Sequence, residues 1–330
     1  MPPRTIVYVV DSSTERKDST LTWALSFARW YEADLHVVHV CRSGGVTAAT
    51  GGARREELVG RIKSIVEASG AAGVNVVPAV LSGRPVRAIA EYSRRVAADL
   101  VVVTNRARRS SGYWLAGSFA AALGKAVASP TIVLPDGLQL SVGPGSPFGN
   151  IVSAIDFSDA SLLGLSEALN LAQRSRGHLK LVHVLSGFPY ETVYGGGGAS
   201  RLRPRLGAGV ARINRGLRRL IPSGAVNWSK IDTTTVTGEA REGILAVASR
   251  TRADLIVLGL PRRSRIEEFV AGTTVHGILR RATSPVLLVP GPPTPPRFQL
   301  AEERDLMFGL YPSAFGVPAV GSREGHTSWR

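Results

Sequence analysis

Three consecutive residues near the carboxyl end of the chain, Gly272, Thr273 and Thr274, have the types and order expected of a phosphate site. The glycine would let a ligand approach the backbone closely, and both threonine hydroxyls can donate hydrogen bonds. The sequence predicts that a helix opens here, so that its first amides lack partners and lie at the positive end of its dipole. A threonine that only caps the helix would give the same pattern, and these residues alone leave both interpretations open.

Other polar or small residues follow predicted strands of the same region. Gly259 ends a predicted strand, Arg262 comes three positions later, and nine residues separate Arg262 from Gly272. Asp156 follows an earlier strand. In open α/β sheets, ligands bind outside the carboxyl ends of strands where the strand order reverses. We therefore take the loops after these two strands as the candidate site, with helix capping as the alternative role of Asp156.

These residues belong to the second of two similar halves. The Asp-Leu pair at Asp99 returns at Asp254, 155 positions later, and the same spacing recurs elsewhere: Gly83 with Gly238, Gly117 with Gly272, and Ser129 with Ser284. Earlier pairs are closer, with Asp11 and Asp156 separated by 145 positions and His39 and His183 by 144. The difference indicates an insertion in the second half, near residues 190–200. A period this long indicates a duplicated domain, because solenoid repeats are far shorter.

Each half alternates short apolar runs with helical stripes. The runs are rich in β-branched residues and almost continuously apolar, which is typical of parallel strands covered on both faces. Stripes such as Leu21, Ala24, Leu25 and Ala28 have the spacing of an amphipathic helix. The pattern predicts βαβ units with a parallel sheet in each half. The fifth strands, Thr131–Leu134 and Val286–Val289, are bounded by proline on both sides, which is typical of strands at the edge of a sheet. We expect these two edge strands to pack against each other.

The domain boundaries follow from these patterns. We expect domain 1 (copy one) over residues 1–137, a linker over 138–148, domain 2 (copy two) over 149–291 and a Pro-rich tail over 292–330. Phe298, Phe308, Tyr311 and Phe315 of the tail could dock on the body. With a single cysteine, Cys41, the chain forms no internal disulfide, and the sequence shows neither a signal peptide nor a membrane-spanning run. These features predict a cytoplasmic protein with no membrane span.

The assembled motifs resemble the universal stress protein family. The resemblance rests on a first strand followed by Asp and Ser, His-Val in the second strand, Ala-Asp-Leu before the fourth, and Gly-(Ser/Thr) followed by Ser-Pro before the fifth. It covers nearly all of both copies. It implies an α/β fold of two tandem Rossmann-like domains of the adenine nucleotide alpha hydrolase-like type. Each domain would be a five-stranded parallel sheet of order 3-2-1-4-5 flanked by helices, with dimer-like pairing of the fifth strands in one chain or between chains.

One branch of that family binds ATP through Gly-X2-Gly-X9-Gly-(Ser/Thr). Copy two keeps the spacing, but Arg262 replaces the second glycine, where its side chain would either crowd a phosphate or offer it a guanidinium. The resemblance also places Asp156 on the adenosine side and Val184 beside the base. Copy one departs further, with Thr104 and Ala107 at the first two glycine positions. We therefore expect ATP or AMP to bind in copy two, and weakly or not at all in copy one.

No catalytic constellation can be assigned. His39 and His183 lie in apolar strands and are expected to be packed residues rather than bases, and no carboxylate pair or catalytic triad is present. The sequence favours a stress-response signalling module that binds adenine nucleotide, with at most weak ATP hydrolysis and no metal. The alternative is an interaction scaffold without nucleotide that uses the fold only to pair; the missing second glycine in both copies favours it.

The charge of the chain is strongly positive and uneven. The net charge is +15, and residues 192–231 contribute eight arginines and lysines without one acidic residue. Such a stretch attracts anions. Its predicted helix has apolar positions at Leu202, Leu206, Val210, Ile213 and Leu217, with three glycines that weaken it. The predicted helix has no aromatic residues on which bases could stack. We therefore favour a solvated helix face over an anion-binding patch, and nucleic acid is not an expected partner.

Overall fold

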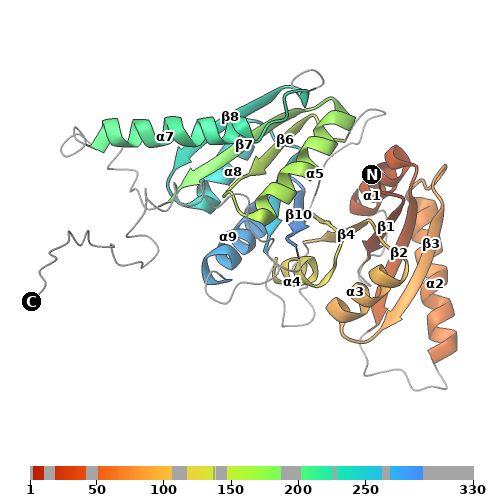
Figure 1. Cartoon of the computed structure of the whole chain (residues 1–330). Helices are drawn as coiled ribbons and strands as arrows, with labels where there is room; N and C mark the ends of the chain where they lie inside the picture. Colours follow the sequence, from red (N-terminus) through yellow and green to blue (C-terminus); the bar gives the residue numbers. More distant parts are fainter. Residues whose placement is uncertain are drawn as a thin grey trace, which may run out of the picture.

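A computed structural model describes residues 3–10, 19–41, 51–105, 117–136, 138, 147–186, 202–225, 229–261 and 268–292, with the backbone alone at 51, 202–206 and 268–273. The strands of both copies join in one sheet of ten, in the order β3-β2-β1-β4-β5-β10-β9-β6-β7-β8 (Figure 1). Each copy therefore has the strand order 3-2-1-4-5 that the resemblance implied. The postulated insertion at 190–200 and the tail aromatic residues lie outside the described part of the chain.

Copy one alternates strands and helices in the expected order. Its strands are β1 (Thr5–Val9), β2 (Asp34–Cys41), β3 (Val76–Ser82), β4 (Leu100–Thr104) and β5 (Thr131–Leu134). Its helices are α1 (Ser19–Tyr31), α2 (Gly51–Ala68), α3 (Pro85–Arg95) and α4 (Ser118–Ala126). All neighbouring strands within the copy are parallel. The stripe predicted at Leu21, Ala24, Leu25 and Ala28 is the buried side of α1.

Copy two repeats this arrangement. Its strands are β6 (Asn150–Ala154), β7 (His178–Leu185), β8 (Ile231–Thr237), β9 (Leu255–Leu260) and β10 (Val286–Pro290). Its helices are α5 (Asp159–Ser175), α7 (Leu202–Arg219), α8 (Ala240–Arg250) and α9 (Glu268–Arg281). Its neighbouring strands are also parallel. Among the described residues, no helix has the length and apolarity needed to cross a membrane.

The two fifth strands meet at the centre of the sheet, as the sequence predicted. β5 and β10 pair antiparallel, with Val133 opposite Val286 and Thr131 opposite Leu288. This is the one antiparallel pairing of the described sheet, and it reverses the direction of every strand beyond it. The carboxyl ends of the strands of copy one and of copy two therefore lie on opposite edges.

The hydrophobic core forms two layers, one on each face of the sheet. Side chains of successive strand residues alternate between the layers: Ile6 belongs to one and Val7 to the other. Each layer contains residues of both copies, because one includes Leu35 and Leu179 and the other includes Val101 and Val286. The near-continuous apolarity of the strands is thus explained by burial on both sides.

An aromatic cluster joins the copies beside the sheet. Phe148, the last residue of the predicted linker, is fully buried, and its ring centroid lies 5.8 Å from that of Phe27 and 6.2 Å from that of Trp23 in α1. The Arg174 guanidinium of α5 lies 4.7 Å from the Tyr31 ring centroid and 5.4 Å from that of Trp30. The linker thus contributes a core residue, which its Gly- and Pro-rich composition did not indicate.

Candidate functional site

The strand register brings two of the predicted site residues of copy two to one level and a third within one residue of it. Ala154 of β6 is paired with Val182 of β7 and with Leu258 of β9. Two residues further along, Asp156 is therefore level with Val184, while Gly259 lies one residue short of that level on the other side. β6 stands between β7 and β9, where the strand order reverses. In open α/β sheets this reversal is the usual place for a ligand.

Asp156 builds the turn that leads from β6 into α5. Its Oδ1 accepts hydrogen bonds from the Ser158 amide (2.9 Å) and the Ser158 hydroxyl (2.5 Å). Ser158 in turn caps α5, accepting a bond from the Ser161 amide (3.2 Å). The carboxylate is exposed, and its Oδ2 has no hydrogen bond to a described residue. Asp156 thus supports the helix cap, as the alternative interpretation held, and keeps one oxygen available.

His183 is a packed residue, as its position in an apolar strand predicted. Its Nδ1 donates a hydrogen bond to the carbonyl of Ile155 (2.7 Å), and the ring is buried against Phe157, with the two centroids 5.4 Å apart. Burial lowers the pKa of the imidazole, although the nearby Asp156 carboxylate opposes the change. The ring is therefore neutral near pH 7 and fixes the backbone that precedes Asp156.

Val184 packs against α8. A Cβ placed on Gly243 of α8 would lie 3.0 and 3.2 Å from the two methyl groups of Val184 and 3.0 Å from Val236. Gly243 therefore lets α8 approach β7 and β8 closely. Val184 is half-buried, so a part of its surface remains at the carboxyl edge. Gly243 was not among the predicted site residues, although a glycine inside a helical pattern is a signal of close packing.

Gly259 does not end its strand, contrary to the prediction. β9 continues to Leu260, and Gly259 is paired with Val289 of β10. A Cβ on Gly259 would lie 2.3 Å from the Ala160 carbonyl carbon and 2.4 Å from the Ser161 amide nitrogen of α5. The absence of a side chain at this position thus allows the start of α5 to rest on the end of β9. This packing requires glycine whether or not a ligand is present.

The helix after β9 begins earlier than the sequence predicted. α9 starts at Glu268, so Gly272, Thr273 and Thr274 occupy its second turn rather than its first. In a helix, the amides without intrahelical partners are those of the first four residues. The amide of Gly272 therefore belongs to the regular helix. Arg262 lies outside the described residues, and of Gly272 and Thr273 only the backbone is described.

The corresponding helix start of copy one is covered by copy two. Gly117 precedes α4 in a left-handed conformation (φ 89°), and a Cβ there would lie 3.1 Å from Leu279 Cβ and 3.5 Å from the His276 carbonyl of α9. Asn105, just after β4, donates a hydrogen bond to the Leu279 carbonyl. Ala107 and its neighbouring arginines lie outside the described residues. The start of α4 in copy one is thus packed against α9 of copy two.

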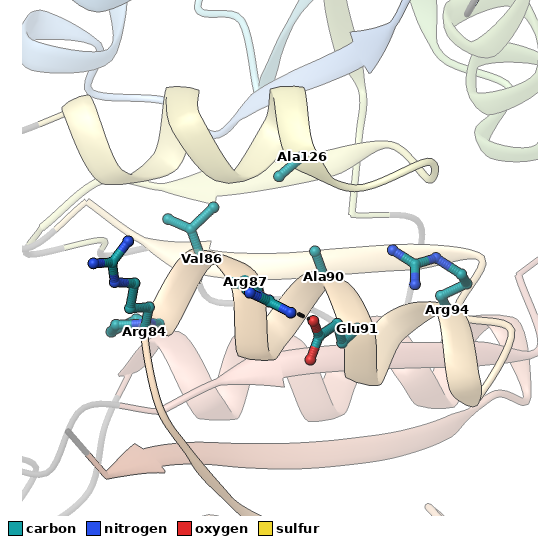
Figure 2. A pocket seen from close by; sticks show the side chains of 8 residues that line it. Arg84, Val86, Arg87, Ala90, Glu91, Arg94 and Ala126 are labelled. Carbon is teal, nitrogen blue, oxygen red and sulfur yellow. Dashed lines mark hydrogen bonds and ion pairs between the residues drawn. The ribbon is translucent and has the colours of Figure 1, made fainter. Parts of the chain in front are cut away.

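Copy one has a groove between α3 and α4. Val86 and Ala90 of α3 point toward Ala126 of α4, and Arg87 pairs with Glu91 (2.7 Å) beside them (Figure 2). The groove has a volume of about 640 Å³. No pattern in the sequence predicted this groove.

Copy two fills the equivalent groove. At the repeat spacing of 155, Arg241 stands at the position of Val86 and Arg281 at that of Ala126. Arg241 crosses to α9, where its Cδ lies 2.2 Å from the place of a Cβ on Gly277, and Arg281 pairs with Glu242 (2.5 Å). The described residues contain no group of three side chains suited to a metal ion.

Comparison with known sequences accounts for both halves at once. The model of the universal stress protein family matches residues 3–135 and again residues 147–290. The chain belongs to the universal stress protein family. It is similar to a universal stress protein of Methanocaldococcus jannaschii, at 25% identity over 146 residues, which are 44% of this chain and 84% of the relative.

Solved structures show the same tandem architecture. A universal stress protein from Archaeoglobus fulgidus superposes with a TM-score of 0.61 at 16% identity, covering 88% of this chain and 97% of its own. A putative universal stress protein from Pseudomonas aeruginosa gives a TM-score of 0.50 at 14% identity, covering 88% and 94%. At these identities the likeness establishes only the fold of this universal stress protein.

Proposed function

We propose that this universal stress protein serves in stress-response signalling by binding an adenine nucleotide, ATP or AMP, at the carboxyl edge of copy two. The observation that carries the proposal is the strand reversal at β6. There Asp156 and Val184 lie level with each other beside Gly259, at the place where open α/β sheets hold ligands. Family membership and the Gly-X2-X-X9-Gly-Thr spacing of copy two support the same ligand class.

Different residues of this edge would contact different parts of the nucleotide. The free Oδ2 of Asp156 can accept a hydrogen bond from a ribose hydroxyl, and the exposed part of Val184 can contact the base. The phosphates would lie toward the loop after β9, near Arg262 and the start of α9, with Gly272, Thr273 and Thr274 on its second turn. Because α9 has already begun at Glu268, the amide of Gly272 lies inside the helix and would not be a free donor to a phosphate.

The alternative is a scaffold that has no nucleotide site. It is favoured by Gly259, whose lack of a side chain is fully explained by the contact with α5. It is also favoured by α9, because its early start places Gly272 inside the helix. Under this alternative the fold serves to pair the copies and to present surfaces to other proteins.

Calorimetric titration with ATP and with AMP tests the proposal. Asp156→Asn keeps the Oδ1 that accepts from Ser158 and replaces Oδ2 by a donor, so we expect normal folding and several-fold weaker binding, the loss of about 0.5–1.5 kcal/mol. Gly272→Val should abolish binding by occupying the space beside the phosphate. Gly60→Val is its matched control, because Gly60 lies in α2 with nothing within 4 Å of the added Cβ. If neither nucleotide binds at millimolar concentration, the proposal is wrong and the scaffold without a nucleotide site is the remaining interpretation.

Arg262→Gly separates the two roles of that side chain. Tighter nucleotide binding would mean that the arginine obstructs the phosphate, and weaker binding would mean that its guanidinium contacts it. Gly117→Val is not a usable control in copy one, because its positive φ and its 3.1 Å approach to Leu279 would disturb the contact between the copies.

A further inference from the structure

The arginines of α7 lie on one exposed face of the helix. Ile213 and Leu217 are buried in the core layer beneath the helix, and Asn214 accepts a hydrogen bond from the Thr235 hydroxyl of β8 (2.9 Å). At about 100° per residue, the exposed Arg212, Arg215, Arg218 and Arg219 fall within an arc of about 120° that faces away from the two buried residues. The helix stands at the end of the molecule opposite copy one (Figure 1).

α7 is one continuous helix, contrary to the expectation that its glycines weaken it. It runs for 18 residues from Leu202 to Arg219, a length of about 27 Å. Pro204 falls in the first turn, where no intrahelical amide bond is lost. Gly216 lies under the Phe157 ring, 3.5 Å from the place of its Cβ, and so lets the helix approach the turn after β6. The arginines therefore form a fixed row.

Three of these charges, those of Arg212, Arg215 and Arg218, are not neutralised by any residue that the structure describes. α7 contains no acidic residue, and Arg212, Arg215 and Arg218 form no ion pair with a described residue. Among the described residues of this copy, Asp232, Glu239 and Glu242 form ion pairs, and none of these pairs involves Arg212, Arg215 or Arg218. A guanidinium is weakly hydrated and binds phosphate through two parallel hydrogen bonds, so the row formed by Arg212, Arg215 and Arg218 is suited to a phosphate polymer.

The equivalent helix of copy one provides an internal comparison. α2 also has 18 residues and buries Leu58, Ile62 and Val66 on the same side of the sheet. Its charged residues are mixed, with Glu56, Glu57 and Glu67 among the basic ones, and Arg54 pairs with Glu57 (2.8 Å). The fold therefore does not require an arginine face at this position.

We propose that the arginine face of α7 binds the phosphate backbone of a nucleic acid duplex without reading its sequence. A row from Arg212 to Arg219 extends over about 10 Å of helix axis, along which a duplex carries about six phosphate charges. Single strands are less suitable ligands because α7 has no aromatic residue on which a base could stack. A membrane surface is less suitable because Ile213 and Leu217 are buried in the protein and cannot enter lipid.

The full-length protein is titrated onto a fluorescein-labelled DNA duplex of mixed sequence, about 20 base pairs long, and anisotropy is followed between about 50 and 200 mM salt. Three to four phosphate contacts predict a slope of log K against log salt of about −3 to −4. The variant R212Q/R215Q/R218Q should lose at least tenfold in affinity at low salt, and the slope should become shallower by about 2.7. Thermal unfolding should confirm that this variant and the control variant described next remain folded.

The matched control is R55Q/R61Q/K63Q, which removes three exposed positive charges from α2. Its affinity should stay within about twofold of the unsubstituted protein. Equal losses in the two variants would mean that net charge alone attracts DNA and would overturn the proposal, as would no loss in the α7 variant. Vesicles of acidic phospholipid serve as the competing ligand. Tighter binding to the vesicles than to DNA, lost in the α7 variant, would also overturn it in favour of a membrane surface.

Discussion

His183 shows how a single buried group can control the edge of the candidate site. Its imidazole donates to the Ile155 carbonyl and lies against Phe157, so it holds the backbone on either side of the turn that begins at Asp156. The exposed Asp156 carboxylate is then positioned by Ser158. The geometry of the site therefore depends on a residue that would not itself contact a nucleotide.

The pKa of His183 predicts a dependence of stability on pH. Burial lowers this pKa in the folded protein, whereas the unfolded chain has the ordinary value of about 6.5. Protons therefore bind the unfolded state preferentially between these two values, and the free energy of unfolding should fall as the pH drops from 7 through 6.5 toward the folded pKa. Denaturant unfolding at a series of pH values measures the effect.

His183→Asn is the informative variant for this pH dependence. The asparagine amide can still donate to the Ile155 carbonyl, but it does not titrate. The fall in stability between pH 7 and 5 should therefore be smaller in the variant. An unchanged pH profile would show that other groups, such as the partly buried His36, whose pKa is also lowered, cause the acid sensitivity.

At the scale of elements, close contacts between backbones position the helices. α5 rests on β9 at Gly259, and α8 rests on β7 and β8 at Gly243. Both contacts need a position without a side chain, and both lie near the carboxyl edge of copy two. The site is therefore held by packing that tolerates little change in volume.

Gly259→Ala should destabilise the protein by about 1–3 kcal/mol, the usual effect of overpacking, since the new methyl group would meet the backbone of Ala160 and Ser161. The comparison is Gly207→Ala in α7, where nothing lies within 4 Å. That change should stabilise the helix by about 0.5–1 kcal/mol. Chemical denaturation measures both. Similar stability of the two variants would show that α5 can shift away from β9 without loss.

Sequence patterns predicted the elements better than their contacts. The proline-bounded fifth strands and the apolar stripe of α1 follow from local rules of edge strands and helix periodicity, and the structure confirms both. The predicted start of α9 was wrong because the Gly-Thr-Thr sequence is typical of the first residues of a helix. Glu268 is an equally good first-turn residue, and the helix has already begun there. Gly259 was assigned to a ligand because sequence cannot show that α5 approaches it. Phe148 was missed because its neighbours are typical of a loop.

For the whole molecule, the structure argues against independent halves. The sheet is continuous through β5 and β10, each core layer includes both copies, and Phe148 packs beneath α1. We therefore expect a single unfolding transition in calorimetry, with agreement between the calorimetric and van't Hoff enthalpies. Two separate transitions would show that the copies unfold independently.

Phe148→Ala extends this test to the contact between the copies. Removing the buried ring should cost about 3–5 kcal/mol and lower the midpoint of the whole transition rather than split it. Circular dichroism and tryptophan fluorescence should report the same midpoint, because Trp23 lies against Phe148 and the sheet spans both copies. Different midpoints for the two probes would contradict a shared core.

The contact between Arg174 and Trp30 has a consequence for assembly. At the repeat spacing of 144, these two residues occupy equivalent positions of α5 and α1. In a dimer of identical units, a contact between equivalent positions would bring two arginines or two tryptophans together, and a cation over an aromatic ring would be unattainable. Joining the halves in one polypeptide makes this heterotypic contact possible. If the second halves of two chains paired with each other, their Arg174 side chains would face each other and repel. The duplication therefore favours pairing of the first half with the second half.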